Sequence, residues 1–378
     1  SLNDTPADKW LSLFLFLSVL YISPWMLGFA GWYDQQPYRD ILFYTPFQQL
    51  FLIGPVIFFY VQSLLNPSFH FGRKHWLHLI PGFLYVLYCL LMVVTDKLVV
   101  GDYFFLADQQ DRDFDAWYQL AGYFSMIIYF VASISYYNRY KQLMPGVVSY
   151  AGTLVFSWVR NFLLAFLAIL LIKTLFFLVS LVVNVGYWDE WWYFLAFSCC
   201  FYYIAITGYS NSVKTKVPFQ AQVFTKKPAV LLWDNKAGHS VRIEEAELIE
   251  TIKAGNETPG DALFIAEWKN KILDAVVGKK LFEEPELSLS DLATSLQTNP
   301  SILSKAVNKS FGLNFNDFIN YYRVLAVQEK LKGGAHKKQT LLGIAYDAGF
   351  NSKATFNRAF KKVTGLSPKE WLEKEILS

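Results

Sequence analysis

Residues 341–363 read LLGIAYDAGFNSKATFNRAFKKV. Apolar residues recur at helical spacing on both sides of one glycine, which predicts a helix over Leu341–Ala348 and another over Ser352–Val363. Gly349 lies between them and can adopt the left-handed backbone conformation that a tight turn needs. Two short helices joined in this way are typical of a helix-turn-helix unit, whose second helix enters a major groove of DNA.

The same arrangement occurs upstream, over Ser288–Leu296 and Asn299–Ser310. A capping box formed by Ser288 and Asp291 predicts the start of the first helix, and an asparagine N-cap followed by proline predicts the start of the second. A long amphipathic helix over Phe315–Lys332 separates the two units. The sequence therefore predicts two helix-turn-helix units joined by a stiff helix, which can reach successive major grooves about 34 Å apart.

Four segments of this region resemble the AraC/XylS family of bacterial transcription regulators: Phe315–Arg323, Ile344–Phe350, Ser352–Lys361 and Thr364–Pro368. The likeness covers about residues 287–372 without a gap and implies an AraC-type DNA-binding domain over residues 285–378. Where the family commonly has Gly-Ile-Ser at the first turn, this chain has Gln297-Thr298-Asn299. A multi-span membrane region ahead of such a domain resembles a membrane-bound subgroup of the family, whose members carry one further span before the first one here.

The resemblance also implies which side chains meet double-stranded DNA. Exposed positions early in each recognition helix contact base edges, and arginine or lysine there can read guanine. The expected base contacts are Ser301, Ser304, Lys305, Lys353, Ala354, Thr355 and Arg358. The expected phosphate contacts are Asn308, Lys309, Lys361 and Lys362. Residues 285–378 hold 13 basic and 8 acidic residues, and this net charge of +5 suits a nucleic-acid partner.

The two halves of the chain differ sharply in charge. Residues 1–210 contain 22 charged side chains, whereas residues 211–378 contain 43. Soluble domains are about a quarter charged, so only the second half has the composition of a soluble domain. A single soluble enzyme is therefore excluded, and the first half is interpreted as a transmembrane sensor domain over residues 1–210.

Six apolar runs of that first half are long enough to cross a hydrocarbon core of about 30 Å as helices. They are Leu11–Trp32, Ile41–Leu65, Leu77–Thr95, Ala116–Tyr137, Trp158–Tyr187 and Glu190–Ser210. One set of connecting segments holds most of the basic residues: Lys9, Arg73, Lys74, Arg139, Lys141, Lys214 and Lys216. By the positive-inside rule these segments and both ends are cytoplasmic. We therefore expect a multi-pass protein of the bacterial inner (cytoplasmic) membrane, with lipid as a partner.

Lys173 lies near the middle of the fifth predicted span. A lysine at this depth is costly and often marks a ligand or an ion pathway. The alternative is a structural role, with the ammonium group bonded to helix carbonyls or to tyrosine hydroxyls. As a membrane ligand-binding residue, Lys173 would favour an amphipathic or anionic small molecule.

Residues 211–284 are interpreted as a cytoplasmic linker. Ala229–Trp233 and His239–Ile243 predict a small β-hairpin. Residues 261–280 predict a helix with one apolar stripe, formed by Leu263, Phe264, Trp268, Ile272, Leu273 and Val276. A homodimer contact is the favoured interpretation of this stripe, and packing against the following domain is the alternative.

The fold class expected is all-α, a polytopic transmembrane helix bundle followed by a cytoplasmic domain with two helix-turn-helix units. The leading hypothesis for function is a one-component transcription factor, in which an unknown small-molecule ligand bound by the membrane domain controls DNA binding by a homodimer. The second hypothesis makes the membrane domain a passive anchor and assigns regulation to a protein partner. Sequence motifs of membrane enzymes do not occur, so neither enzymatic activity nor a cofactor or metal is expected.

Overall fold

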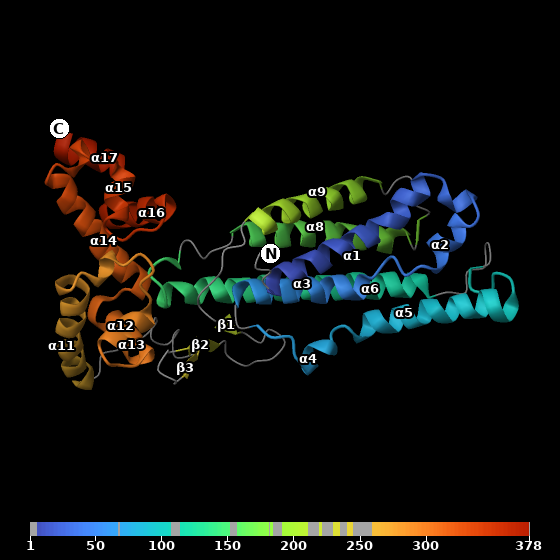
Figure 1. Ribbon diagram of the computed structural model, residues 1–378, viewed down its shortest axis with the longest axis horizontal. Coiled ribbons are helices and arrows are strands. Elements are labelled where there is room, and N and C mark those ends of the chain that lie inside the picture. Colours follow the sequence, from blue (N-terminus) through green and yellow to red (C-terminus); the bar gives the residue numbers. More distant parts are fainter. Residues whose placement is uncertain are drawn as a thin grey trace, which may run out of the picture. The chain divides into compact units, whose positions relative to one another are not determined.

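The computed structural model describes residues 6–66, 69–106, 114–151, 157–180, 182–183, 191–210, 219–220, 230–234, 240–244 and 259–377 (Figure 1). The described residues of 1–137 and 157–216 form one compact unit, here called the N-terminal unit. Those of 138–156 and 217–378 form the C-terminal unit. The three-part division at residues 210 and 284 stays a prediction. In the structure, the described residues of 138–156 belong to the same compact unit as the DNA-binding region.

The N-terminal unit is helical. Its helices are α1 (Pro6–Phe29), α2 (Tyr38–Tyr44), α3 (Leu50–Leu65), α4 (Arg73–Trp76), α5 (Ile80–Val93), α6 (Asp115–Leu143), α8 (Ser157–Ser180) and α9 (Trp191–Ser210). Among the described residues, five helical stretches are long and apolar enough to cross a membrane: Pro6–Phe29, Ile80–Val100, Asp115–Gly146, Ser157–Ser180 and Trp191–Gly208. These correspond to five of the six predicted spans.

The prediction of one continuous helix over Ile41–Leu65 is wrong. The chain leaves α2 at Thr45, which has an extended ψ of 129°, and becomes helical again at Leu50. Pro46 explains the break, because a proline ring disfavours the helical conformation in the residue before it. An apolar composition alone does not reveal such an interruption.

Helix α3 lies at the centre of this unit. Thirteen of its sixteen residues are buried, and it packs against α1 and α6 (Figure 1). The rings of Phe58 on α3 and Tyr136 on α6 meet edge to face at 6.2 Å. Helix α5 is different, because most of its large apolar side chains point outward, as Phe83, Leu84 and Leu87 do.

The junction contains a three-stranded antiparallel sheet in the order β1 (Phe219–Gln220), β2 (Val230–Asp234), β3 (Ser240–Glu244). The predicted hairpin corresponds to β2 and β3. This small sheet is an addition to the all-α class, which is otherwise confirmed by the helices of both units.

The predicted linker helix forms as α11 (Pro259–Leu273), followed by a π-helical turn over Asp274–Gly278. Ile272 and Val276 are fully buried in the core of the following domain, and Trp268 packs against that core. The side chains of Leu263 and Phe264 lie outside the described part of the chain. Packing within the chain therefore accounts for Trp268, Ile272 and Val276 of the stripe, and the homodimer contact stays a prediction.

The DNA-binding region contains α12 (Leu289–Ser295), α13 (Pro300–Phe311), α14 (Phe315–Lys332), α15 (Leu341–Tyr346), α16 (Lys353–Thr364) and α17 (Pro368–Leu372). The predicted capping box of Ser288 and Asp291 and the N-cap at Asn299 are confirmed. Phe315, Phe318 and Ile319 on α14 enter the core of the first helix-turn-helix unit. Val324, Val327 and Leu331, further along α14, enter the core of the second unit. One helix thus supports both units.

The two turns use different residues for the left-handed conformation. In the first unit Gln297 takes it, with φ of 51°, at the turn where the family commonly has glycine. In the second unit Gly349 takes it, with φ of 90°. A Cβ atom on Gly349 would lie 2.5 Å from the carbonyl oxygen of Phe282 and 2.7 Å from that of Glu283. Backbone of the segment before α12 therefore packs directly on this turn.

We predict that Gly349→Ala destabilises the C-terminal unit by about 2–5 kcal/mol, the sum of the left-handed conformation and the steric overlap. The matched control is Gly365→Ala, because Gly365 has φ of 78° but no atom within 4 Å of an added Cβ. Its cost should be only about 1–2 kcal/mol. Thermal proteolysis of the full chain in detergent, read at a C-terminal tag, measures both. Equal losses in the two variants would contradict the close packing at Gly349.

Candidate functional site

Helices α13 and α16 are the second helices of the two helix-turn-helix units, the position at which such units carry their recognition helix. Each begins at a side-chain N-cap: Asn299 Oδ1 accepts from the amide of Ser301 at 2.7 Å, and Ser352 Oγ accepts from the amide of Thr355 at 3.2 Å. Each ends at a left-handed glycine, Gly312 or Gly365. Residues close in the sequence therefore set both ends of each helix. Each helix packs one face on the core and turns the other to solvent.

On α16 the exposed face is continuous. Lys353, Ala354, Asn357, Arg358 and Lys361 are exposed, while Phe356 and Phe360 are buried in the core. Asn357 was not among the predicted contacts, although its spacing of four residues from Lys353 and from Lys361 places it on the same face. An asparagine and an arginine side by side supply the side chains that pair with adenine and guanine in the major groove.

Thr355 lies on the opposite side of α16. Its side chain is only 2% exposed, and its Oγ1 accepts a hydrogen bond from Ser352 Oγ at 3.0 Å. Its role here is to complete the N-terminal cap of the helix. The burial of Thr355 argues against the base contact predicted for it.

On α13 the predicted positions divide in the same way. Lys305 is exposed and Ser301 is half-buried at the start of the helix, but Ser304 is only 8% exposed. The neighbouring Ile302 is 43% exposed and was not predicted. Ser304 therefore faces the core, whereas Ile302 and Lys305 face outward, and an exposed isoleucine suits contact with a thymine methyl group.

The predicted phosphate contacts also differ among themselves. Asn308 and Lys309 are half-buried on α13, and Lys361 is exposed on α16. Lys362 instead forms an ion pair with Asp317 of α14, with Nζ 2.6 Å from Oδ2. This ion pair ties α16 to the shared helix α14, so the charge of Lys362 is partly neutralised within the domain.

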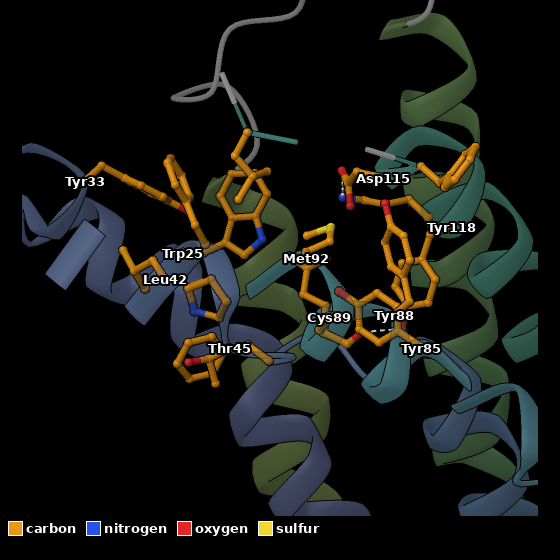
Figure 2. Close-up of a pocket in the computed structure, with 17 residues that line it drawn as sticks. Trp25, Tyr33, Leu42, Thr45, Tyr85, Tyr88, Cys89, Met92, Asp115 and Tyr118 are labelled. Carbon is orange, nitrogen blue, oxygen red and sulfur yellow. Dashed lines mark hydrogen bonds between the residues drawn. The ribbon is translucent and has the colours of Figure 1, made fainter. Parts of the chain in front are cut away.

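The N-terminal unit contains a pocket of about 480 Å³ at the ends of α1, α5 and α6 and around the break between α2 and α3. Figure 2 shows Trp25 and Leu42 on one wall and Met92 and Tyr118 on the other. Eight aromatic side chains line it: Trp25, Tyr33, Phe43, Phe47, Tyr85, Tyr88, Phe114 and Tyr118. Its volume and lining fall in the range of small-molecule sites. Sequence reasoning missed the pocket because its residues come from four separate segments.

Polar groups of this pocket are few and well placed. The hydroxyl of Tyr118 donates to the carbonyl oxygen of Gln48 and accepts from the amide of Leu50 at 3.1 Å, which satisfies backbone freed by the helix break. Asp115 is the acidic residue of the lining and accepts from Gln119 Nε2 at 3.0 Å. In the described part of the chain, no group of three or more His, Cys, Asp or Glu side chains is arranged to hold a metal ion.

Lys173 is not part of the pocket lining. It is 3% exposed, and its Nζ lies over three aromatic rings, 5.6 Å from Trp25, 5.2 Å from Tyr193 and 5.8 Å from Phe194. Such cation–π contacts stabilise a desolvated ammonium group. Trp25 belongs to both environments, because the same indole also lines the pocket.

A chain of polar side chains connects the pocket with Lys173. Gln119, bonded to Asp115, accepts from the hydroxyl of Tyr123 at 2.8 Å. Tyr21 interacts with Tyr123 and forms a 3.0 Å hydrogen bond with Tyr193, whose ring contacts Lys173. The chain crosses from α6 through α1 and α9 to α8.

Comparisons with known proteins concern the C-terminal unit. Residues 292–374 match the family model described as a helix-turn-helix domain. An uncharacterized HTH-type transcriptional regulator of Staphylococcus aureus (strain COL) is 32% identical over 102 residues, which make up 27% of this chain and 13% of that protein. The uncharacterized HTH-type transcriptional regulator YtdP of Bacillus subtilis (strain 168) is 31% identical over 85 residues, 22% of this chain and 11% of its own.

A solved structure of a protein of unknown function from Listeria innocua is 31% identical and covers 28% of this chain and 93% of its own, with a TM-score of 0.25. The chain spans about an eighth of the length of the curated regulators it matches. The family match over residues 292–374 coincides with the two helix-turn-helix units built on α14, with their caps and their left-handed turns. Residues 292–374 therefore form a helix-turn-helix domain of the AraC type.

Proposed function

We propose that this protein is a membrane-bound one-component transcription factor, in which ligand sensing by the N-terminal unit controls sequence-specific DNA binding by the C-terminal unit. The observation that carries this proposal is an AraC-type helix-turn-helix domain in one chain with five helices long and apolar enough to cross a membrane. A helix-turn-helix regulator acts on double-stranded DNA, so signal and response reside in one molecule.

The surface of the N-terminal unit supports a membrane location. Large apolar side chains are more than 50% exposed along α5 and α8, including Leu84, Leu87, Leu90, Leu171 and Leu175. Soluble proteins rarely expose contiguous apolar surface of this extent. With the bias of lysine and arginine between connecting segments, these faces support a bacterial inner-membrane protein whose C-terminal domain is cytoplasmic. Helix α3, short but enclosed by its neighbours, serves as the sixth crossing.

The DNA contacts are proposed from exposure. Lys353, Ala354, Asn357 and Arg358 on α16, with Ser301, Ile302 and Lys305 on α13, face bases, and Lys361 contacts phosphate. Two protomers on a two-fold symmetric operator would present four recognition helices. We retain a homodimer as part of the proposal.

The sensing site is proposed to be the aromatic pocket. Its rings and the carboxylate of Asp115 favour a ligand that joins an apolar or aromatic group to a cationic one. This reverses the charge expected from Lys173 alone, because Lys173 does not line the pocket, whereas Trp25, whose ring it contacts, does. A ligand that shifts Trp25 would disturb the polar chain that ends at Lys173, and differential affinity for two arrangements of the bundle would shift their populations.

Arg358→Ala should weaken binding by about 1–3 kcal/mol on the preferred site and relax selectivity at one base position. Lys361→Ala is the matched control on the same helix face, and it should weaken all duplexes similarly and reduce the dependence of the binding constant on salt. Affinities of the full chain for a selected and a scrambled duplex at several salt concentrations measure both effects. Equal losses of affinity on both duplexes for Arg358→Ala would show that Arg358 does not contact a base.

Lys173→Met should change the transcriptional response of a target promoter about fivefold or more, because it removes the charge held by three aromatic rings at the end of the polar chain. Protein level in the membrane and DNA affinity of the purified chain should stay as in the wild type. Leu175→Met, at a 60% exposed position of the same helix, is the control and should leave the response unchanged. A wild-type response in Lys173→Met would favour the passive-anchor alternative.

A further inference from the structure

The segment that follows α6 is built into the DNA-binding region. A short 3₁₀ turn over Met144–Gly146 ends the helix, and Val147, Val148 and Ser149 then run through the interior with no exposed surface. The segment connects two apolar helices, α6 and α8. Arg139 and Lys141 near the end of α6 predict, by the positive-inside rule, that it lies on the cytoplasmic side. The burial of Val147, Val148 and Ser149 is therefore unusual for an interhelical connection, which would normally lie at the surface.

Main-chain hydrogen bonds pair this segment with the entry to α12. The amide of Leu289 donates to the carbonyl oxygen of Val147 at 2.8 Å, and the amide of Ser149 donates to that of Leu287 at 3.1 Å. Val148 thereby stands opposite Ser288 in an antiparallel bridge. Ser288 is also the N-cap of α12, so the pairing holds the residue at which the first helix-turn-helix unit begins.

Side chains of α14 complete the contact. Ser149 Oγ donates to the carbonyl oxygen of Leu287 at 2.7 Å and accepts from Arg323 Nη2 at 3.1 Å. The carbonyl oxygen of Ser149 accepts from Asn320 Nδ2 at 3.2 Å. The amide, the carbonyl oxygen and the hydroxyl of Ser149 are therefore all hydrogen-bonded inside the domain.

Arg323 makes the contact energetically significant. It is fully buried, and its hydrogen-bond partners are neutral oxygens: Ser149, Asn320 and the carbonyls of Phe282 and Glu284. Burial lowers the pKa of Arg323 to about 9, so the guanidinium stays charged at neutral pH. A buried charge that loses one hydrogen-bond partner is costly, and withdrawal of Ser149 would leave an Nη2–H group short of an acceptor.

We propose that the slot between Leu287–Leu289 and α14 is a peptide-binding site whose occupant is Val147–Ser149 of the same chain, and that its occupancy holds the first helix-turn-helix unit in its DNA-binding form. The regulatory meaning of this site rests on the proposed function. Because the occupant follows α6 directly, displacement of α6 would pull on the segment and loosen the entry to α12. The second unit, whose core lies at the other end of α14, would keep its structure.

A cysteine pair tests the docking by itself. Val148→Cys with Ser288→Cys, in a chain whose three native cysteines are replaced, should form a disulfide, because non-hydrogen-bonded antiparallel partners have Cα atoms about 4.5 Å apart. With a protease site inserted between residues 245 and 258, the two fragments of the cleaved full chain should stay joined until reduced. The two single-cysteine variants are the controls. Failure of the pair to join the fragments would overturn the proposal.

Hydrogen exchange of the full chain in detergent tests the consequence. Ser149→Lys places a large cation in the filled slot, and amides of residues 287–311 should exchange at least tenfold faster, while those of 341–364 stay protected. Ser149→Ala, which keeps the main-chain pairing, should give a smaller increase in the same region. Ser157→Lys, at an exposed serine that begins α8, is the matched control and should exchange as the wild type does.

The outcomes separate this proposal from the proposed function. Wild-type exchange in Ser149→Lys, or loss of protection in both units at once, would overturn the control of the first unit by docking. A disulfide and localised exchange in a chain that binds no duplex preferentially would establish the docking and refute the proposed function. Preferential binding that falls at least tenfold in Ser149→Lys and is kept in Ser157→Lys would support both.

Discussion

The buried guanidinium of Arg323 organises the C-terminal unit. Its Nε and Nη2 groups hold the carbonyls of Phe282 and Glu284 at 2.7 and 2.6 Å, and the backbone at this segment packs on the left-handed turn at Gly349. The same side chain reaches Ser149. A charge removed from water is tolerated only when its donors are satisfied, so the entry to the first helix-turn-helix unit and the segment after α6 are constrained together. Helix α14, which carries Arg323, enters the cores of both helix-turn-helix units.

In the N-terminal unit, too, buried polar groups are connected to one another. Its interior is dominated by aromatic rings, and several of the polar side chains that enter it are linked: Asp115 and Gln119 at the pocket, tyrosines on three helices, and Lys173 at the far end. In an apolar bundle such a network is sensitive to small displacements, because each member depends on its neighbour for hydrogen bonding or for charge stabilisation. This is the physical basis on which a ligand at the pocket is proposed to alter the helices. Helix α6 carries some of the pocket residues, and the segment that contacts Arg323 follows it in the chain.

Local signals in the sequence predicted local structure well, but they did not predict contacts between residues far apart in the chain. The caps at Ser288 and Asn299 and the turn at Gly349 depend on residues a few positions apart, and the structure has them where the pattern predicts. The break at Pro46 was hidden within an apolar run. Lys173 was identified as unusual from its depth, but its ring partners lie far away in the chain. The contact of Ser149 with Arg323 spans 174 positions, and no spacing rule connects such residues. On α16, Asn357 is exposed and Thr355 is buried because they lie on different faces of the helix, a difference that residue type does not reveal.

We propose above all that this chain binds specific DNA sites while it is anchored in the membrane. The most direct measurement is the chromosomal occupancy of the full-length protein, crosslinked in its native cells, beside that of the Arg358→Ala variant at equal abundance. We expect discrete promoter-proximal sites for the wild type, which share a motif spanning two successive major grooves, and a loss or change of those sites in the variant. Uniform background occupancy, or the same sites in both proteins, would contradict the proposal.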